Sequence, residues 1–82
     1  MKMSREEIFE KLNEVFREVF DDDELVISDS TNSDEIEDWD SLEHISLIVS
    51  MEKEFSMKFD IKEINTLKDV GEMIDLIKRK MD

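Results

Sequence analysis

The sequence predicts an all-α protein: a small bundle of three main helices and one short helix, with a long loop between the first two. Apolar residues recur at intervals of three and four in separate segments, which is the spacing of one helix face. A residue that can cap a helix precedes each segment. Proline is absent and glycine occurs once, so the chain has no evident interdomain linker or glycine-rich phosphate loop, and we expect residues 1–82 to form a single domain.

The first amphipathic segment predicts a helix from about Arg5 to Val19. Ser4 precedes it and Glu7 follows three residues later, a pair typical of a capping box, in which each side chain accepts the backbone N–H of the other residue. The apolar face of this helix consists of Ile8, Leu12, Val15, Phe16, Val19 and Phe20.

The second helix is predicted to start after Asp40, with Glu43 as the partner three residues later. Its apolar series is Leu42, Ile45, Ile48, Met51 and Phe55, and Leu47 and Val49 widen it. A helix that is apolar over more than one face usually packs against several neighbours. We therefore expect it to lie centrally in the bundle.

A short third helix and a longer last helix are expected in the C-terminal third of the chain. The short helix covers Ile61 to Ile64, with Asp60 as its cap and Glu63 three positions later. The last helix is opened by Thr66 and Asp69, and its apolar residues are Val70, Met73, Ile74, Ile77 and Met81. Positive side chains near its C-terminus favour the helix dipole, and these are Lys78, Arg79 and Lys80.

The segment from Phe20 to Trp39 is long for a loop in a small domain. Its apolar residues can anchor it to the core, and these are Leu25, Val26, Ile27 and Ile36. Residues 28–34 have the composition of turns, and a single helical turn within the loop remains open.

The charge is strongly negative, with 24 acidic and 11 basic residues and a net charge of −13. Such a surface repels nucleic acid and anionic membranes and attracts a basic protein partner. Cysteine is absent, so the protein itself supplies no thiolate nucleophile and no cysteine metal site, which suits a reducing cytoplasm. No apolar run approaches the ~20 residues that span a membrane, and the N-terminus lacks the pattern of a signal peptide. We expect a cytoplasmic monomer.

Ser41 is the candidate functional residue. A serine at a helix start usually caps the helix, but here Asp40 can accept that role and leave the hydroxyl free. Ser41 then lies in the first helical turn, where backbone N–H groups and the helix dipole favour a negative phosphate. The long loop before it leaves this position open to another protein.

Asp40-Ser41-Leu42 followed by "EHISLIVSMEKEF" resembles the attachment region of acyl carrier proteins. The resemblance continues through the leading amphipathic helix, the acidic loop, a short helix near "FDIKEI" and a closing helix from "TLKDVGEMIDLI", and so covers essentially the whole chain. It implies a carrier and not an enzyme: Ser41 receives 4′-phosphopantetheine from coenzyme A through a phosphodiester bond, and the arm carries an acyl thioester.

The same resemblance assigns roles to the neighbouring residues. Asp40 would help to position coenzyme A and its metal ion in the phosphopantetheinyl transferase, and Leu42 would be an apolar contact beside the site. Glu43, Glu52 and Glu54 would meet basic docking patches on acyl-loading and acyl-transfer enzymes. The chain itself is expected to hold no metal.

Several residues depart from the fatty-acid type of carrier, and these are Trp39, His44, Ser46, Val49 and Lys53. They favour a discrete carrier of a specialised pathway in fatty acid, polyketide or other acyl metabolism. Peptidyl carriers usually have glycines before the serine, and "EDWDS" has none. A D-alanyl or aminoacyl carrier stays open.

Two other function classes compete with a carrier. A non-covalent acidic adaptor would bind a basic partner through the second helix without modification. A calcium-responsive module is favoured by Asp29, Thr31, Ser33 and Asp40 at EF-hand positions one, three, five and twelve, but the required glycine at position six is Asp34.

Three further features have simple structural interpretations. We expect Trp39 to pin the loop to the helices and His44 to be a solvent-exposed helix residue, because a Ser-His hydrolytic pair would need an orienting group and a deep pocket. Met51, Met57 and Met73 could line a cargo site, but we expect them to fill gaps in the core.

Overall fold

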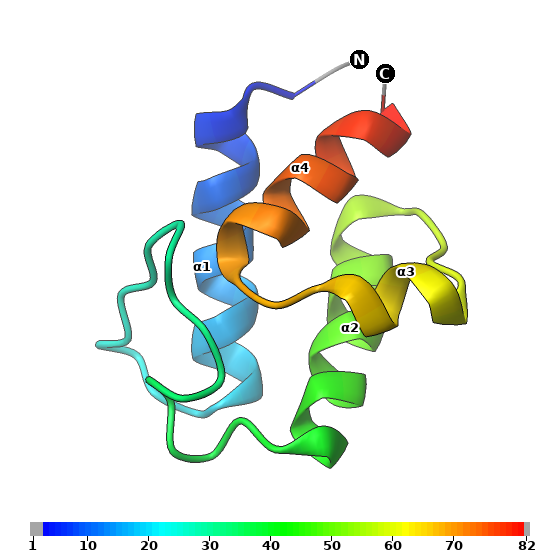
Figure 1. Ribbon diagram of the computed structural model, residues 1–82. Helices are drawn as coiled ribbons and strands as arrows, with labels where there is room; N and C mark the ends of the chain where they lie inside the picture. Colours follow the sequence, from blue (N-terminus) through cyan, green and yellow to red (C-terminus); the bar gives the residue numbers. More distant parts are fainter. Residues whose placement is uncertain (1–2, 82) are drawn as a thin grey trace.

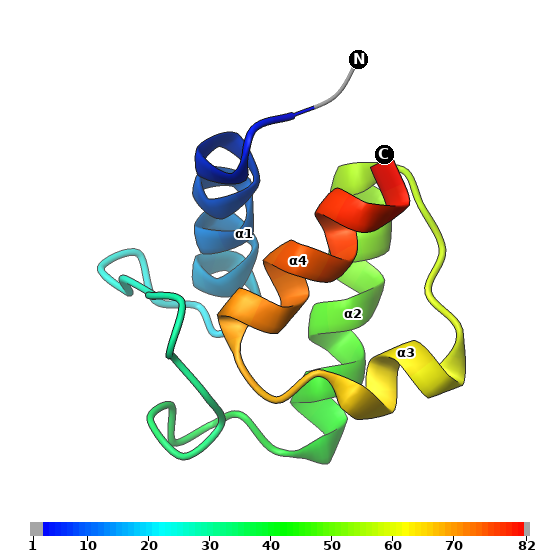
Figure 2. The same ribbon diagram turned by 45° about the horizontal axis from the view of Figure 1, so that its top comes forward.

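The structure is a computed structural model that describes residues 3–81, and within them the chain forms four helices and no strand. These are α1 (Arg5–Val19), α2 (Ser41–Phe55), α3 (Ile61–Thr66) and α4 (Val70–Met81). Helices α1 and α2 run side by side in opposite directions, α4 crosses over them, and α3 lies on the side of α2 away from α1 (Figures 1 and 2). The all-α prediction, with one short helix and a long first loop, is therefore confirmed.

Reciprocal hydrogen bonds fix the starts of α1 and α3 as the sequence predicts. In α1, the Glu7 N–H donates to Ser4 Oγ at 3.2 Å and the Ser4 N–H donates to Glu7 Oε1 at 3.0 Å. Asp60 and Glu63 form the same capping box in α3, with both hydrogen bonds at 3.0 Å. Each box satisfies two backbone N–H groups that the first helical turn would leave unpaired.

Of the two residues predicted to open α4, one has that role in the structure. The Glu72 N–H donates to Asp69 Oδ1 at 2.9 Å, so Asp69 acts as the cap. The prediction for Thr66 is wrong, because Thr66 is the last residue of α3. The short helix continues two residues beyond its predicted end at Ile64, since nothing in its local sequence stops it there, and helix ends are weakly determined by sequence.

The long loop also supports the first turn of α4. The Val70 N–H donates to the Thr31 carbonyl at 3.0 Å, and the Gly71 N–H donates to the Asp29 carbonyl at 2.8 Å. A Cβ atom at Gly71 would lie 3.0 Å from that Asp29 oxygen, so glycine allows the close approach of loop and helix. The two segments thereby pair residues that are about half the chain apart.

The core lies where α1, α2 and α4 meet. The fully buried side chains are Ile8, Leu12, Phe16, Leu47, Met51, Val70, Met73, Ile74 and Ile77. Met51 and Met73 are among them, and Met57 is half-buried against this cluster, so the structure supports the core-filling interpretation of these methionines.

A buried asparagine holds the loop onto α1. Asn13 Oδ1 accepts the Ile27 N–H at 2.8 Å, and its Nδ2 donates to the Leu25 carbonyl at 3.4 Å. Ile27 is buried, while Leu25 and Ile36 are half-buried against the core, as predicted. The prediction for Val26 is wrong, because its side chain is 73% exposed. Leu25 and Ile27 take the inward positions, and Val26 between them lies at the surface.

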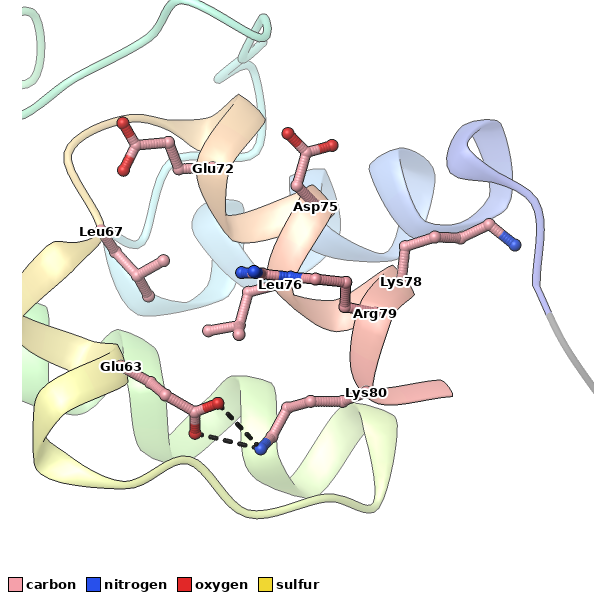
Figure 3. A pocket seen from close by; sticks show the side chains of 8 residues that line it. All are labelled: Glu63, Leu67, Glu72, Asp75, Leu76, Lys78, Arg79 and Lys80. Carbon is pink, nitrogen blue, oxygen red and sulfur yellow. Dashed lines mark hydrogen bonds and ion pairs between the residues drawn. The ribbon is translucent and has the colours of Figure 1, made fainter. Parts of the chain in front are cut away.

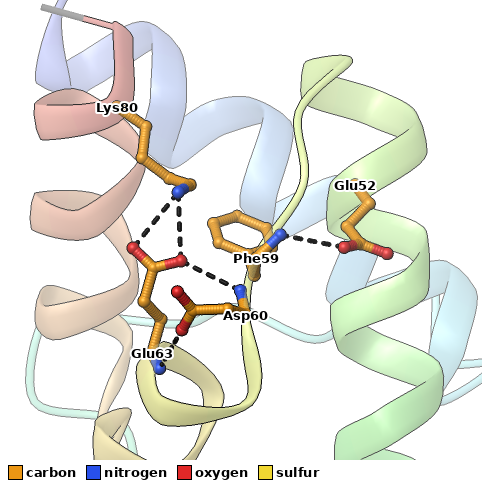
Figure 4. Close-up of polar contacts among 5 residues, drawn as sticks. All are labelled: Glu52, Phe59, Asp60, Glu63 and Lys80. Carbon is orange, nitrogen blue, oxygen red and sulfur yellow. Dashed lines mark hydrogen bonds and ion pairs between the residues drawn. The ribbon is translucent and has the colours of Figure 1, made fainter.

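Charged contacts tie α3 to its neighbours (Figure 4). Lys80 Nζ on α4 lies 3.0 and 3.1 Å from the two carboxylate oxygens of Glu63, and 5.7 Å from the centre of the Phe59 ring. On the other side, Glu52 Oε2 on α2 accepts the Phe59 N–H at 3.0 Å. The short helix is therefore fixed from both sides, although its own length would not make it stable.

Acid is expected to remove part of the stability through Glu63. The Asp60 N–H and then the Lys80 ammonium group hold the pKa of Glu63 below its ordinary value of 4.5. Above that value the carboxylate is charged in both the folded and unfolded states, so its full contribution is present. As the pH falls from 4.5 through the lower folded pKa, the unfolded state takes up the proton first and the contribution is lost.

Glu63→Gln should therefore show a smaller loss of stability on acidification than the unchanged protein. Urea unfolding between about pH 7 and pH 3 measures this difference. Lys80→Met keeps the capping box, which is the largest cause of the lowered pKa of Glu63, and removes both the hydrogen bond and the charge of Lys80, so it should give an intermediate loss. A free-energy difference between Glu63→Gln and the unchanged protein that stayed constant over this range would contradict the expectation.

Candidate functional site

Ser41 is the first residue of α2, where the long loop ends. Asp40 is the cap, and its Oδ1 accepts the Glu43 N–H at 2.8 Å. Ser41 is exposed, and within residues 3–81 its hydroxyl makes no hydrogen bond. The prediction that Asp40 caps the helix is confirmed, and the Ser41 hydroxyl is free to react.

An exposed apolar stripe begins beside Ser41, and we call Leu42, Ile45 and Val49 the α2 stripe. Their exposures are 70%, 59% and 45%. The sequence grouped Leu42 and Ile45 with the core-facing series of this helix, which is wrong. Leu47, Ile48, Met51 and Phe55 face the core instead, because so much of the α2 surface is apolar that periodicity alone does not define the inward side.

Trp39 pins the end of the loop to the bundle, as predicted. The residue is 7% exposed, and its ring meets Phe16 edge-on with centroids 5.3 Å apart and Phe20 at 6.2 Å. Its indole Nε1–H donates to His44 Nδ1 at 3.1 Å. Both the aromatic contacts and this hydrogen bond therefore hold Trp39 in place.

His44 is not the solvent-exposed residue that the sequence predicts. The side chain is half-buried, because Trp39 covers one side and the third helix approaches the other. Since Nδ1 accepts from Trp39, the neutral imidazole carries its proton on Nε2. This Nε2–H donates to the Ile64 carbonyl oxygen, 3.4 Å away. His44 thus connects the loop, α2 and α3.

A groove of about 570 Å³ lies directly beside Ser41. The end of the loop, the first turns of α2 and the end of α3 enclose it, and its lining includes Trp39, Ser41, His44, Ile45, Ile64 and Leu67. Both polar and apolar side chains are present, so a flexible group attached to the Ser41 oxygen has a surface on which to lie.

A larger hollow of about 860 Å³ lies between α3 and α4 and includes no residue of α2 (Figure 3). Its lining carries both signs of charge, on Glu63, Glu72, Asp75, Lys78, Arg79 and Lys80. Glu63 and Lys80 neutralise each other across it. The groove beside Ser41 therefore stays the candidate site, in preference to the larger hollow.

The three acidic residues predicted to bind partners have different surroundings. Glu43 is half-buried in the first turn of α2. Glu52 accepts the Phe59 N–H, and Glu54 lies 3.4 Å from Lys11 Nζ. Two of the three carboxylates thus have partners inside the molecule, and the docking role of all three stays a prediction.

Three residues of the EF-hand-like pattern have other contacts, and Asp40 among them caps α2. Asp29 Oδ2 lies 3.6 Å from Arg5 Nη2, and the Asp29 carbonyl accepts the Gly71 N–H. Thr31 Oγ1 accepts the Ser28 N–H at 2.8 Å. In the part of the chain that the structure describes, no three acidic, histidine or cysteine side chains are grouped to hold a metal ion.

None of the helices within residues 3–81 combines the length and apolar character that crossing a membrane requires.

Comparison with known proteins agrees with this geometry. An acyl carrier protein from Petrotoga mobilis is 30% identical over 82 residues, which cover 98% of this chain and 94% of that protein. This chain belongs to the acyl carrier protein family. The acyl carrier protein of Lactobacillus acidophilus is 33% identical over 76 residues, covering 93% and 95% of the two chains. That of Thermotoga maritima is 30% identical over 78 residues, covering 95% and 96%. No family model matches the chain.

A solved structure of an acyl carrier protein has the same fold as this chain. The solution structure of a holo acyl carrier protein from Geobacter metallireducens has a TM-score of 0.82 and 43% sequence identity. The match covers 88% of this chain and 83% of that one. Acyl carrier proteins are carriers and not enzymes, and the recognition of the family from the Asp40-Ser41-Leu42 region is confirmed.

Proposed function

We propose that this acyl carrier protein holds an acyl group as a thioester on a 4′-phosphopantetheine arm attached to Ser41. A phosphopantetheinyl transferase would supply the arm from coenzyme A. The single observation that carries the proposal is the Ser41 hydroxyl, which is exposed at the first position of α2 while Asp40 caps the helix in its place. A hydroxyl needed for capping would have to break its own hydrogen bond before an enzyme could modify it.

The surroundings of Ser41 fit a phosphodiester. The first turn of a helix presents backbone N–H groups that lack partners within the helix, and the dipole adds positive potential there. Both favour the negative charge of a phosphate joined to the Ser41 oxygen. The groove of about 570 Å³ beside Ser41 has room for part of a flexible arm. When bound, the arm supplies the thiol that holds the acyl group.

We assign supporting roles to the two neighbours of Ser41. Asp40 would hold the first turn of α2 in place and help to position coenzyme A and its metal ion within the transferase. Leu42, which is 70% exposed, would give an apolar contact to the transferase or to the arm. Both proposals are supported by the position of these side chains on either side of the reacting hydroxyl.

Partner enzymes are proposed to dock on α2. The net charge of −13 attracts basic patches, and Glu43, Glu52 and Glu54 are the acidic candidates on this helix. The α2 stripe adds apolar contact area next to Ser41. Tethering raises the local concentration of the acyl group at each docked enzyme, to about the millimolar range for a short flexible arm.

We favour a carrier of a specialised pathway over a carrier of housekeeping fatty acid synthesis. Such a pathway would belong to fatty acid, polyketide or other acyl metabolism. The support is chemical: Ser46 and Lys53 reduce the negative charge of α2, and Trp39 and His44 form a polar contact behind Ser41. We propose that the chain acts in the cytoplasm as a monomer of one domain. A D-alanyl or aminoacyl carrier is the alternative within the family, and a non-covalent acidic adaptor is the alternative outside it.

A modification assay tests the proposal. The purified protein is incubated with coenzyme A, Mg²⁺ and a broad-specificity phosphopantetheinyl transferase, and its intact mass is measured. We expect a gain of one phosphopantetheinyl unit, located on the peptide that contains Ser41. If several broad-specificity transferases gave no gain, the adaptor would be the better account.

A further inference from the structure

A chain of hydrogen bonds connects three groups that line the groove beside Ser41, and we call Trp39, His44 and the Ile64 carbonyl the groove bridge. The indole N–H of Trp39 lies 3.1 Å from His44 Nδ1, and His44 Nε2 lies 3.4 Å from the Ile64 oxygen. These three groups come from the loop, α2 and α3, which are the segments that enclose the groove. The groove bridge therefore spans the gap between α2 and α3.

The space behind the groove bridge is filled. Trp39 packs against Phe16 and Phe20, and Phe16 has no exposed surface. Leu47 and Met51, further along the inner side of α2, are also fully buried. A group attached to Ser41 can lie along the groove, and beside it the contact between His44 and the Ile64 carbonyl joins α2 to α3.

Opening the groove bridge breaks a hydrogen bond that an alkyl chain cannot replace. Separation would leave the His44 Nε2–H without its acceptor in a partly buried position, while the Ile64 carbonyl keeps the Leu67 N–H at 3.3 Å. An alkyl chain has no donor or acceptor to replace the lost partner, although it gains from leaving water. A short or polar acyl group gains less from burial and can pair with the polar side chains that line the groove.

We propose that His44 is a specificity-determining residue that keeps the carried acyl group in the surface groove and out of the helical bundle. The proposal rests on the proposed function at Ser41 and adds the class of cargo to it, namely short or polar acyl groups. The thioester of such a cargo stays accessible to water and to the next enzyme. A long alkyl chain attached to Ser41 remains equally accessible, because the groove bridge prevents its burial.

Reaction of the thioester with hydroxylamine measures this accessibility. The protein is loaded with butyryl and with tetradecanoyl groups from the corresponding coenzyme A thioesters, and intact mass verifies each loaded form before the rate is measured. In the unchanged protein we expect the two rates to agree within about twofold. In His44→Leu the tetradecanoyl form should react about tenfold more slowly than the butyryl form, the change expected if the chain is buried for nine-tenths of the time.

Two more variants make the test specific to hydrogen bonding. His44→Gln keeps a donor and an acceptor, so it should behave like the unchanged protein. Trp39→Phe removes the indole N–H and keeps an aromatic ring, so it should protect the tetradecanoyl form partly, and it supplies the test if His44→Leu does not fold. The helical circular dichroism and the melting temperature of each variant show whether it is folded.

The outcomes separate the two proposals. If the unchanged protein already protects the tetradecanoyl form as strongly as His44→Leu or Trp39→Phe does, the role of His44 is overturned and the carrier function stands. The same holds if neither variant protects the long chain. If no loaded form appears in the mass spectrum, the proposed function itself fails and the cargo assignment fails with it.

Discussion

Ser41→Ala is expected to abolish the transfer of phosphopantetheine completely and to leave the fold unchanged. The hydroxyl is the proposed acceptor, and alanine has no atom that can replace it. Because Asp40 and not Ser41 accepts the Glu43 N–H, the cap of α2 survives the substitution. Alanine also favours a helix, so the free energy of unfolding should change by no more than about 0.5 kcal/mol. Intact mass after incubation with the transferase, and urea unfolding, measure the two effects.

The other serines of α2 provide matched controls. Ser46 is exposed and Ser50 is half-buried on the same helix. Ser46→Ala and Ser50→Ala should each gain one phosphopantetheinyl unit, as the unchanged protein does. A mass gain in Ser41→Ala would place the acceptor elsewhere, and a large loss of stability would show that the Ser41 side chain has a structural role.

Phe16→Ala is expected to lower the free energy of unfolding by about 3–5 kcal/mol. The ring has no exposed surface, and its centroid lies 5.8 Å from that of Phe20 and 5.3 Å from that of Trp39. Removing it leaves a cavity between α1 and the end of the loop that these neighbours fill only in part. Small domains have a total stability of about 5–15 kcal/mol, so this is a large share. Urea unfolding followed by circular dichroism avoids a direct effect on Trp39 fluorescence.

Phe9→Ala serves as the control. It removes a ring of the same size from the same helix and makes the same change in helix propensity. Phe9 is half-buried at the edge of the core, so its loss should be smaller, about 1–2 kcal/mol. If Phe16→Ala destabilised the protein no more than Phe9→Ala does, the aromatic cluster around Trp39 would not be an important part of the core.

The sequence predicts those features whose partners lie three or four residues apart. The Ser4–Glu7 and Asp60–Glu63 capping boxes and the Asp40 cap are of this kind, and the structure contains all three. Their geometry depends on one helical turn and not on the rest of the molecule. Ser41 was found for the same reason, because its neighbour Asp40 determines whether its hydroxyl is free.

Features that depend on distant partners could not be predicted. Asn13 forms hydrogen bonds with Leu25 and Ile27, which are 12 and 14 residues away, and nothing in the local pattern marks an asparagine on an amphipathic helix as a loop anchor. The sequence predicts an exposed His44, whereas the side chain is half-buried because it contacts the Ile64 carbonyl, 20 residues away. The spacing of Trp39 and His44, five residues apart, was the only available signal.

The sequence also fails to predict the exposure of the α2 stripe, for a different reason. Leu42 and Ile45 have the helical spacing and the hydrophobicity of core residues, and only the position of neighbouring helices shows that they are exposed. Exposed apolar side chains next to the exposed Ser41 are typical of a surface that other proteins contact. The acidic residues were predicted for docking by resemblance, and the structure shows that two of them already have internal contacts.

The arrangement of α1 and α4 affects how the protein is made. α1 packs against α4, Arg5 lies 3.3 Å from Asp75, and Lys78 donates to the Met3 carbonyl at 3.0 Å. The ribosome releases the first of these helices long before the last. Although α2 packs against α1 earlier, the part of the apolar face of α1 that packs against α4 stays uncovered until α4 is translated. Mutual repulsion among the many carboxylates of the nascent polypeptide keeps such emerging chains apart during that interval.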